Sequence, residues 1–189
     1  MRKLVYYVGV SLDGYIAGPN GEYDFYPVGE DLAAYMNAQF PEVVPAHVRE
    51  AIGLEAEPVR YDTLIMGRGT YEPARSVGIA SPYSPLRQYV VSTTLGAVDH
   101  PDVEVTADDP AELIRRLKQE EGKDIYLAGG GKLAASVLPQ IDELIVKLYP
   151  VVAGAGIRAF SGEFQPTMFT LTGTRAFDNG TLVLTYDRA

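Results

Sequence analysis

The chain has 189 residues and a formal net charge of −9, with 47% apolar and 22% charged residues. This length and composition are typical of a globular protein and predict one domain over residues 1–189. The acidic balance argues against a nucleic-acid partner, and no apolar run is long enough to cross a membrane. The chain has no cysteine and only two histidines, which disfavours disulfides, zinc–thiolate sites and His-based metal sites. We therefore expect a cytoplasmic protein without a bound metal.

Short apolar runs alternate with helical patterns along the chain. Strands are predicted at residues 4–12, 61–66, 88–93, 102–105, 124–128 and 141–152, and helices at 30–40, 45–54, 109–122 and 132–138. Residues 73–85 are rich in Pro, Ser and Gly and predict a loop. Residues 167–177 and 181–187, joined by Asp178-Asn179-Gly180, predict a C-terminal β-hairpin, with 181–185 a candidate edge strand. The alternation indicates an α/β domain with a mixed, mostly parallel sheet.

Two glycine-bearing segments each follow a predicted strand and precede a predicted helix. They are Ile65-Met66-Gly67-Arg68-Gly69-Thr70-Tyr71-Glu72 and Leu127-Ala128-Gly129-Gly130-Gly131-Lys132-Leu133. Glycine lets an anion approach the backbone closely, and a helix N-terminus offers unpaired N–H groups. Two such turns favour a ligand with more than one phosphate, such as a dinucleotide. The alternative is a pair of structural turns, since neither segment matches the GxGxxG or P-loop pattern.

An ordered set of four motifs resembles the dihydrofolate reductase superfamily, especially the branch that includes the C-terminal reductase domain of bacterial riboflavin biosynthesis. The motifs are Ser11-Leu12-Asp13-Gly14-Tyr15-Ile16-Ala17, the segment 65–72, Tyr89-Val90-Val91-Ser92-Thr93-Thr94 and the segment 129–133. The resemblance extends over residues 4–187. It implies a three-layer α/β/α fold and a homodimer.

The resemblance also implies NADPH as the cofactor. The implied cofactor-binding residues are Ile16, Ala17, Gly67, Arg68, Thr70, Ser92, Thr93, Gly129, Gly130, Gly131, Lys132 and Leu133. Those in the two glycine turns would hold the phosphates. Ser92 and Thr93, with Arg68 nearby, would surround the adenosine 2′-phosphate, because hydroxyls and a cation suit a dianion. Ile16 and Ala17 would lie in the loop that covers the nicotinamide.

The candidate substrate residues lie mainly on the first predicted helix. Its start, Asp31-Leu32-Ala33-Ala34-Tyr35, resembles the helix of dihydrofolate reductase that carries a pterin-binding acid. A carboxylate facing a cleft could bind an amidine-like edge and assist protonation. Asp31 and Tyr35 are thus candidate substrate residues, and Arg87 falls where folate reductases place an arginine. Asp31 and Asp13 are the candidate catalytic acids, with Asp24 as a rival; an acid in a first helical turn is also common for the helix dipole alone.

The sequence therefore predicts an NADPH-dependent reductase that transfers a hydride to a C=N or C=O carbon of a small heterocycle. The first candidate is the 5-amino-6-(5-phosphoribosylamino)uracil reductase type, and the second is a dihydrofolate or pterin reductase. A non-catalytic NADP-binding protein and a purely structural dimer are the alternatives. The chain departs from both substrate patterns, because it has no tryptophan, carries Tyr15 where the riboflavin branch often has a basic residue, and shows no early basic cluster.

Overall fold

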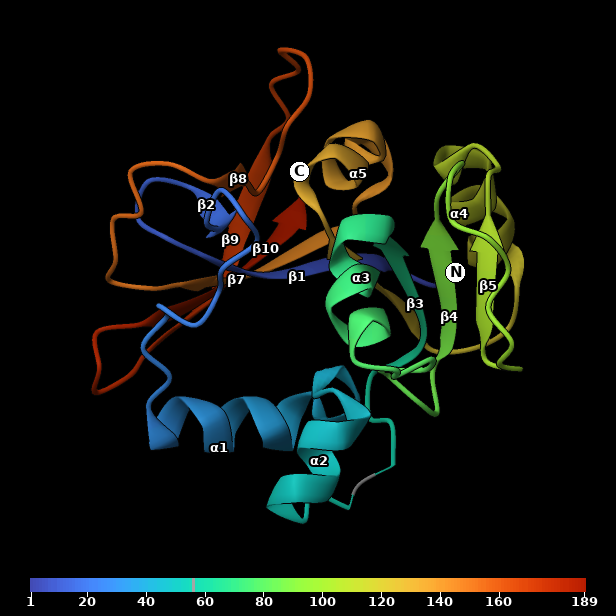
Figure 1. Ribbon diagram of the computed structural model, residues 1–189. Coiled ribbons are helices and arrows are strands. Elements are labelled where there is room, and N and C mark those ends of the chain that lie inside the picture. The colour runs from blue at the N-terminus through green and yellow to red at the C-terminus, as the bar shows by residue number, and fades with distance from the viewer. Residues whose placement is uncertain (56) are drawn as a thin grey trace.

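The computed structural model describes residues 1–55 and 57–189. Eight strands form one sheet: β1 (Leu4–Val10), β3 (Tyr61–Gly67), β4 (Arg87–Val91), β5 (Val103–Thr106), β6 (Asp124–Gly129), β7 (Glu143–Leu148), β9 (Phe169–Ala176) and β10 (Leu182–Arg188). Their order across the sheet is β5-β4-β3-β6-β1-β7-β10-β9 (Figure 1). Two short strands, β2 (Tyr15–Ala17) and β8 (Ile157–Arg158), pair in a separate antiparallel ribbon.

The sheet is mixed in the way the sequence predicts. Strands β5, β4, β3, β6, β1 and β7 run parallel to one another, whereas β10 is antiparallel to β7 and β9 is antiparallel to β10. The prediction that 181–185 forms an edge strand is wrong. The pairing of β10 with β7, for example Leu184 opposite Val146, leaves β9 at the edge.

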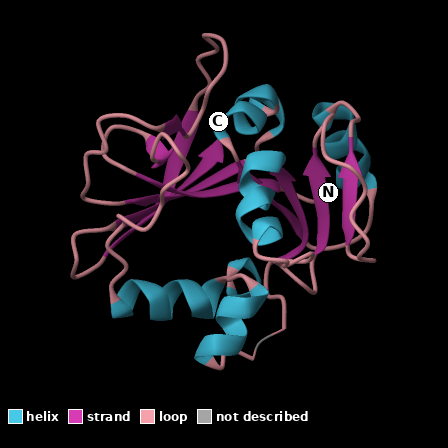
Figure 2. Cartoon of the chain, viewed as in Figure 1, coloured by secondary structure: helices cyan, strands magenta, loops and turns pink. Residues whose placement is uncertain are grey.

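The described residues form five α-helices beside this sheet (Figure 2), and the second of them contributes no buried side chain. They are α1 (Glu30–Gln39), α2 (Ala46–Ile52), α3 (Arg68–Ser76), α4 (Pro110–Gln119) and α5 (Gly131–Ser136), with short 3-10 turns at Pro41–Val43 and Leu138–Gln140. Tyr7 of β1 belongs to the apolar cluster that includes buried side chains of α1 and α3, and Tyr6 to the cluster that includes those of α4 and α5. Successive strand residues point to opposite faces, which is why the central strand β1 is apolar nearly throughout.

Several helix boundaries differ from the predictions: α2 and α4 are shorter than predicted, and α3 and α5 end elsewhere. Helix α3 continues through Pro73 to Ser76, so the predicted loop begins later. Proline normally disfavours a helix interior, but Tyr71 is buried in the core and its hydroxyl donates to the Ala80 carbonyl at 2.8 Å, which holds this helix in place. Helix α5 ends at Ser136 rather than 138, and a 3-10 turn that contains Pro139 follows it. Within the described part of the chain, no helix combines the length and apolar character needed to cross a bilayer.

Candidate functional site

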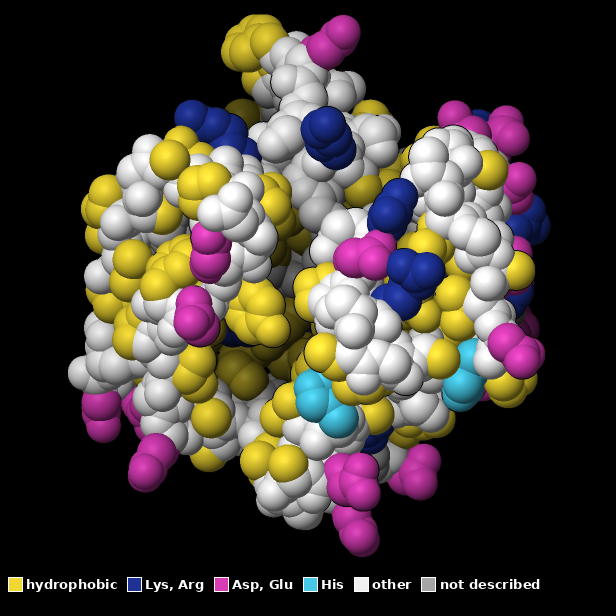
Figure 3. All heavy atoms as spheres, viewed as in Figure 1, with side chains coloured by type: hydrophobic (Ala, Val, Ile, Leu, Met, Phe, Trp, Pro, Cys, Tyr) yellow, Lys and Arg dark blue, Asp and Glu magenta, His cyan; other side chains and the backbone are white. Residues whose placement is uncertain are grey.

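A cleft of about 1510 Å³ lies at the carboxyl ends of the parallel strands. Its lining includes residues that end or follow β1, β3, β4 and β6. Figure 3 shows the cleft as a hollow in the surface, with hydrophobic side chains in its depth. Ligands of open α/β sheets bind at this edge, because the loops that follow parallel strands converge there.

The two glycine turns predicted from the sequence meet in this cleft. A side chain on Gly67 would place its Cβ 3.7 Å from the Gly130 nitrogen, and one on Gly130 would lie 3.9 Å from the Thr70 hydroxyl. Gly129 has a φ of +95°, a conformation that glycine adopts without the steric cost of a side chain. The absence of side chains therefore keeps backbone exposed on both sides of the contact between the turns.

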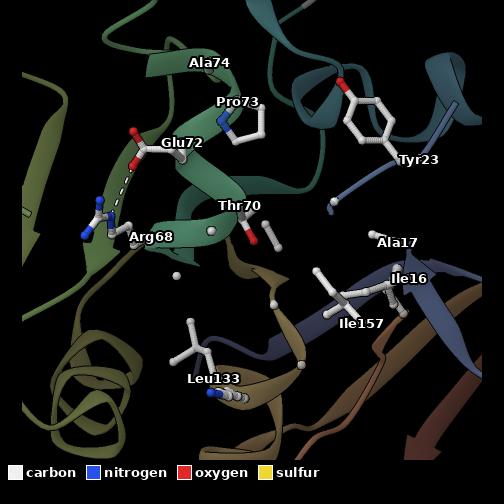
Figure 4. Close-up of a pocket in the computed structure, with 18 of the residues that line it drawn as sticks. Ile16, Ala17, Tyr23, Arg68, Thr70, Glu72, Pro73, Ala74, Leu133 and Ile157 are labelled. Carbon is white, nitrogen blue, oxygen red and sulfur yellow. Dashed lines mark hydrogen bonds and ion pairs between the residues drawn. The ribbon is translucent and has the colours of Figure 1, made fainter. Parts of the chain in front are cut away.

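The β2–β8 ribbon closes one wall of the cleft. Ala17 pairs with Ile157, and the Ser161 N–H donates to the Gly131 carbonyl at 3.0 Å, so the ribbon joins the triple-glycine turn to the loop after β1. In Figure 4, Ile16, Ala17 and Ile157 cluster on this wall. The loop predicted at residues 15–17 is thus a short strand. The sequence reasoning missed its partner strand, for which Gly154 and Gly156 were the available signal.

Arg68 lies at the opposite end of the cleft, beside the end of β4. Its guanidinium donates to the Glu72 carboxylate at 3.1 Å (Figure 4). It also donates to the Thr94 hydroxyl at 2.9 Å. The Ser92 hydroxyl accepts N–H bonds from Thr94 and Leu95, at 3.2 and 3.0 Å. Arg68 and Ser92 thus lie near each other, on either side of Thr94, although neither Ser92 nor Thr93 is among the residues that line the cleft. The hydroxyl that contacts the arginine belongs to Thr94, which the sequence reasoning did not choose over Thr93.

The cleft is cationic although the chain is acidic. Among the described lining residues, the cations are Arg68, Lys132, Lys147 and Arg158, and Glu72 is the one carboxylate. Arg68 and then Arg75 hold the pKa of Glu72 below its ordinary value through hydrogen bonds, so this acid is already paired. A local excess of positive charge attracts anionic ligands even when the whole molecule repels them.

The end of the cleft away from Arg68 is lined by aromatic side chains and by one lysine. Tyr7, Tyr23, Tyr83 and Tyr126 line it, together with Lys147 of β7. The Lys147 Nζ lies 4.6 Å from the centroid of the Tyr7 ring. Burial lowers the pKa of Lys147, an effect partly offset by the neighbouring Tyr149, and burial raises the pKa of Tyr83 to about 12. The sequence does not single out Lys147, because periodicity does not reveal which strand face borders a cleft.

The predicted substrate residues of the first helix lie outside the cleft lining. The Asp31 carboxylate accepts the Asp178 N–H at 2.9 Å and the Leu32 N–H at 2.8 Å, and so ties α1 to the hairpin turn. Tyr35 packs on Phe177, with the Arg175 guanidinium 4.2 Å from its ring centroid. This geometry does not support substrate binding or proton transfer by Asp31, because its carboxylate is engaged by the hairpin rather than presented to the cleft.

Asp13 and Arg87 also have other partners. Asp13 accepts hydrogen bonds from the Ser11 hydroxyl and from the N–H groups of Ala153 and Gly154, which lower its pKa to about 2. A carboxyl with so low a pKa is ionised at neutral pH and does not suit a proton donor. Arg87 stands at the amino end of β4, away from the cleft, where it pairs with Glu120 at 3.0 Å. Its predicted role in substrate binding is therefore not supported.

Comparison with known proteins gives matches over nearly the whole chain. Residues 2–183 match the RibD C-terminal domain family. Two uncharacterized proteins of Bacillus subtilis (strain 168) are similar: YwjB is 32% identical over 178 residues, covering 93% of this chain and 92% of its own length. YyaP is 25% identical over 198 residues, covering 98% and 94%.

Solved structures show the same fold. A putative riboflavin biosynthesis protein from Shewanella sp. PV-4 superposes with a TM-score of 0.73 at 23% identity, covering 99% of each chain. A diaminohydroxyphosphoribosylaminopyrimidine deaminase/5-amino-6-(5-phosphoribosylamino)uracil reductase from Thermotoga maritima superposes with a TM-score of 0.66 at 17% identity, covering all of this chain and 57% of the other. The predicted dihydrofolate reductase-like fold is thus confirmed, and the chain belongs to the RibD C-terminal domain family.

Proposed function

We propose that this protein is an NADPH-dependent reductase that transfers a hydride to a C=N or C=O carbon of a small heterocyclic substrate. The observation that carries the proposal is the cationic cleft in which two glycine turns meet, in a chain with a net charge of −9. Exposed backbone and several cations suit a ligand with separate phosphate groups. Membership of a family named for a riboflavin biosynthesis domain supports the same reading.

The residues present fit the proposed cofactor. Gly67, Thr70 and Gly130 leave room for a pyrophosphate beside the start of α3, and Arg68 with Ser92 would hold the 2′-phosphate. Ile16, Ala17 and Leu133 would pack against the nicotinamide side and exclude water. When bound, NADPH supplies the hydride, and the protein contributes orientation and a pocket with few waters.

The substrate proposed first is of the 5-amino-6-(5-phosphoribosylamino)uracil type. The aromatic end of the cleft, which includes Tyr7 and Tyr126, suits a planar ring, because aromatic side chains contact such rings by face or by edge. Among the described lining residues no free carboxylate faces this ring, because Glu72 lies with the two arginines that pair with it. That absence disfavours the dihydropterin alternative, which needs an acid for the amidine-like edge. The source of the substrate's proton is then water or a neighbouring cationic group.

Assembly as a homodimer, expected from the resemblance, is part of the same proposal. The edge strand β9 has one side without a strand partner in the sheet order, and Leu171 on it is 51% exposed. Met168, just before β9, is 76% exposed, and Phe164 in the preceding loop is 96% exposed. An exposed edge with apolar side chains favours pairing with another chain. The cytoplasmic location stays a prediction of the sequence.

A thermal-shift measurement with NADPH, NADH and NADP⁺ tests the cofactor. A ligand that binds the folded state raises its apparent stability. We therefore expect a larger shift with NADPH or NADP⁺, which carry the 2′-phosphate, than with NADH, which lacks it. Substrate-dependent oxidation of NADPH then separates a reductase from a non-catalytic binding protein. The absence of a shift with all three nucleotides at saturating concentration would contradict the proposal.

Arg68→Ala tests the basis of the selectivity. Removal of the guanidinium should weaken NADPH binding by about tenfold or more while leaving NADH binding nearly unchanged, because only NADPH carries the 2′-phosphate. Arg115→Ala is the matched control, because this arginine lies on the exposed face of α4 and outside the cleft lining. Equal losses for the two nucleotides would show that Arg68 contacts a shared phosphate instead.

A further inference from the structure

Lys147 is the feature of the cleft that the cofactor does not account for. It lies in the middle of the sheet, since β7 pairs it with Gly9 of β1 on one side and with Val183 of β10 on the other. A Cβ on Gly9 would lie 3.7 Å from the lysine Cε and 2.9 Å from the Tyr149 ring. The bare backbone at Gly9 therefore makes room for the Tyr149 ring, which lies beside the lysine stem.

No carboxylate of the described residues forms an ion pair with Lys147, whereas two cations at the start of strands β1 and β3 each have one. Arg2 pairs with Asp62, and Arg60 pairs with Glu143 at 2.6 Å. The groups that surround the Lys147 ammonium are instead the Tyr7 ring and Tyr149. An ammonium held among aromatic side chains without a counter-ion is costly, and an anion that binds beside it would offset that cost.

The polarity of this pocket is the reverse of what the sequence led us to expect. A carboxylate from the first helix was predicted to meet an amidine-like edge of the substrate, but Asp31 is bound to the hairpin turn. The charged group that does line the pocket is a cation. A cation recognises an anionic oxygen, such as a carboxylate or an enolate, and repels an amidinium.

From this arrangement we infer that Lys147 is a substrate-binding residue that anchors an anionic oxygen carried by a planar ring, with Tyr7 and Tyr126 against the ring. This inference deepens the proposed reductase function and rests on it for the reaction. The class of substrate is accordingly a planar heterocycle or aromatic compound with an oxygen that is anionic or carries partial negative charge, as the carbonyl oxygens of a pyrimidinedione do, and an amidine-edged pterin is excluded from the preferred ligands.

Benzoate, benzamide and benzamidine test this inference, because they share a ring and differ in the charge of one small group. Ligand-observed NMR titration of the protein without nucleotide gives the three affinities. We expect wild-type protein to bind benzoate about tenfold or more tightly than benzamide, and benzamidine most weakly. Lys147→Met should abolish the preference, whereas Lys147→Arg should keep most of it. Lys123→Met is the matched control, since this lysine lies outside the cleft, near the carbonyls of Pro58 and Val59.

Two results would overturn the inference: equal binding of the three probes by wild-type protein, or an unchanged benzoate preference in folded Lys147→Met. Circular dichroism establishes that each variant is folded. The probes do not require nucleotide, so the inference and the proposed cofactor fail separately. Benzoate selectivity without an NADPH-induced thermal shift would support the anion site and contradict the reductase proposal. An NADPH-induced shift without benzoate selectivity would support the reductase proposal and contradict the anion site.

Discussion

Gly131 shows how one missing side chain shapes the site. A Cβ at this position would lie 2.0 Å from the Arg158 carbonyl oxygen and 3.2 Å from the Ser161 hydroxyl. The backbone of the β2–β8 wall can approach the triple-glycine turn only because residue 131 has no side chain. The glycine is therefore required by the wall that packs on it, in addition to any ligand.

Gly131→Ala should consequently destabilise the protein by about 1–3 kcal/mol, as other insertions into packed regions do. Urea unfolding measures the change. Gly69→Ala is the matched control, because a Cβ there meets no atom within 4 Å and the position lies inside α3. We expect this control to be neutral or to stabilise by up to about 1 kcal/mol. Equal effects of the two substitutions would show that the wall moves away without cost.

Asp13 gives the loop after β1 a measurable pH dependence. Its pKa is lowered from 3.8 to about 2, chiefly by the Ser11 hydroxyl and then by backbone N–H groups of the 153–154 segment. A lowered pKa means that the ionised form contributes stability above pH 3.8, and that this contribution is lost as the pH falls through about 2.

The difference in unfolding free energy between wild-type protein and Asp13→Asn should thus be constant at neutral pH. It should shrink from about pH 4 downward. Urea titrations of both proteins across this range provide the measurement. A difference that does not change with pH would mean that the Asp13 carboxylate makes no net interaction in the folded state.

Helix α4 illustrates an element whose start is fixed by local chemistry. The Asp109 carboxylate accepts the N–H groups of Ala111 and Glu112 at 2.7 and 3.1 Å, and Pro110 occupies the first turn. These contacts satisfy donors that the helix itself leaves unpaired. The same signals made this helix start predictable from the sequence.

Asp109→Ala should therefore cost about 1 kcal/mol of stability. Asp108→Ala provides the control, because its carboxylate is exposed and lies 3.9 Å from Arg116, and exposed pairs contribute little. Thermal or urea unfolding of both variants gives the comparison. A loss at Asp108 as large as that at Asp109 would indicate that charge near the helix dipole matters more than the cap.

Local signals explain how far the sequence could predict the structure. The glycine turns and the helix cap are encoded in a few adjacent residues, and the structure has them where the sequence suggests. Asp31 shows the limit, because its helix was predicted correctly but the partner of its carboxylate lies 147 positions away in the chain. Lys147 was missed for a related reason: only the assembled sheet shows which strand positions border the cleft. The assignment of Arg87 to the substrate site could have been avoided from the sequence alone. Arg87 begins a parallel strand, and the start of such a strand lies at the edge of the sheet opposite the ligand.

At the scale of the whole molecule, the edge strand β9 leads to a prediction about assembly. Sedimentation equilibrium should give the mass of a dimer, and Leu171→Lys should shift the protein to a monomer, because it puts a charge among the exposed apolar side chains of the edge. Ile52→Lys is the control, since Ile52 is similarly exposed at 55% but lies at the end of α2. A monomeric wild-type protein would refute the dimer, and a dimeric Leu171→Lys variant would exclude this edge as its interface.

The long loop between β8 and β9 projects from the molecule (Figure 1). Its tip carries Phe164, which is 96% exposed, and its base is held by the hydrogen bond from Ser161 to the Gly131 carbonyl. The chain has no cysteine, so Phe164→Cys would create a single attachment point for an environment-sensitive dye. Because the loop is rooted on the triple-glycine turn, which lines the cleft, we expect the emission of a dye at residue 164 to change when a ligand fills the cleft.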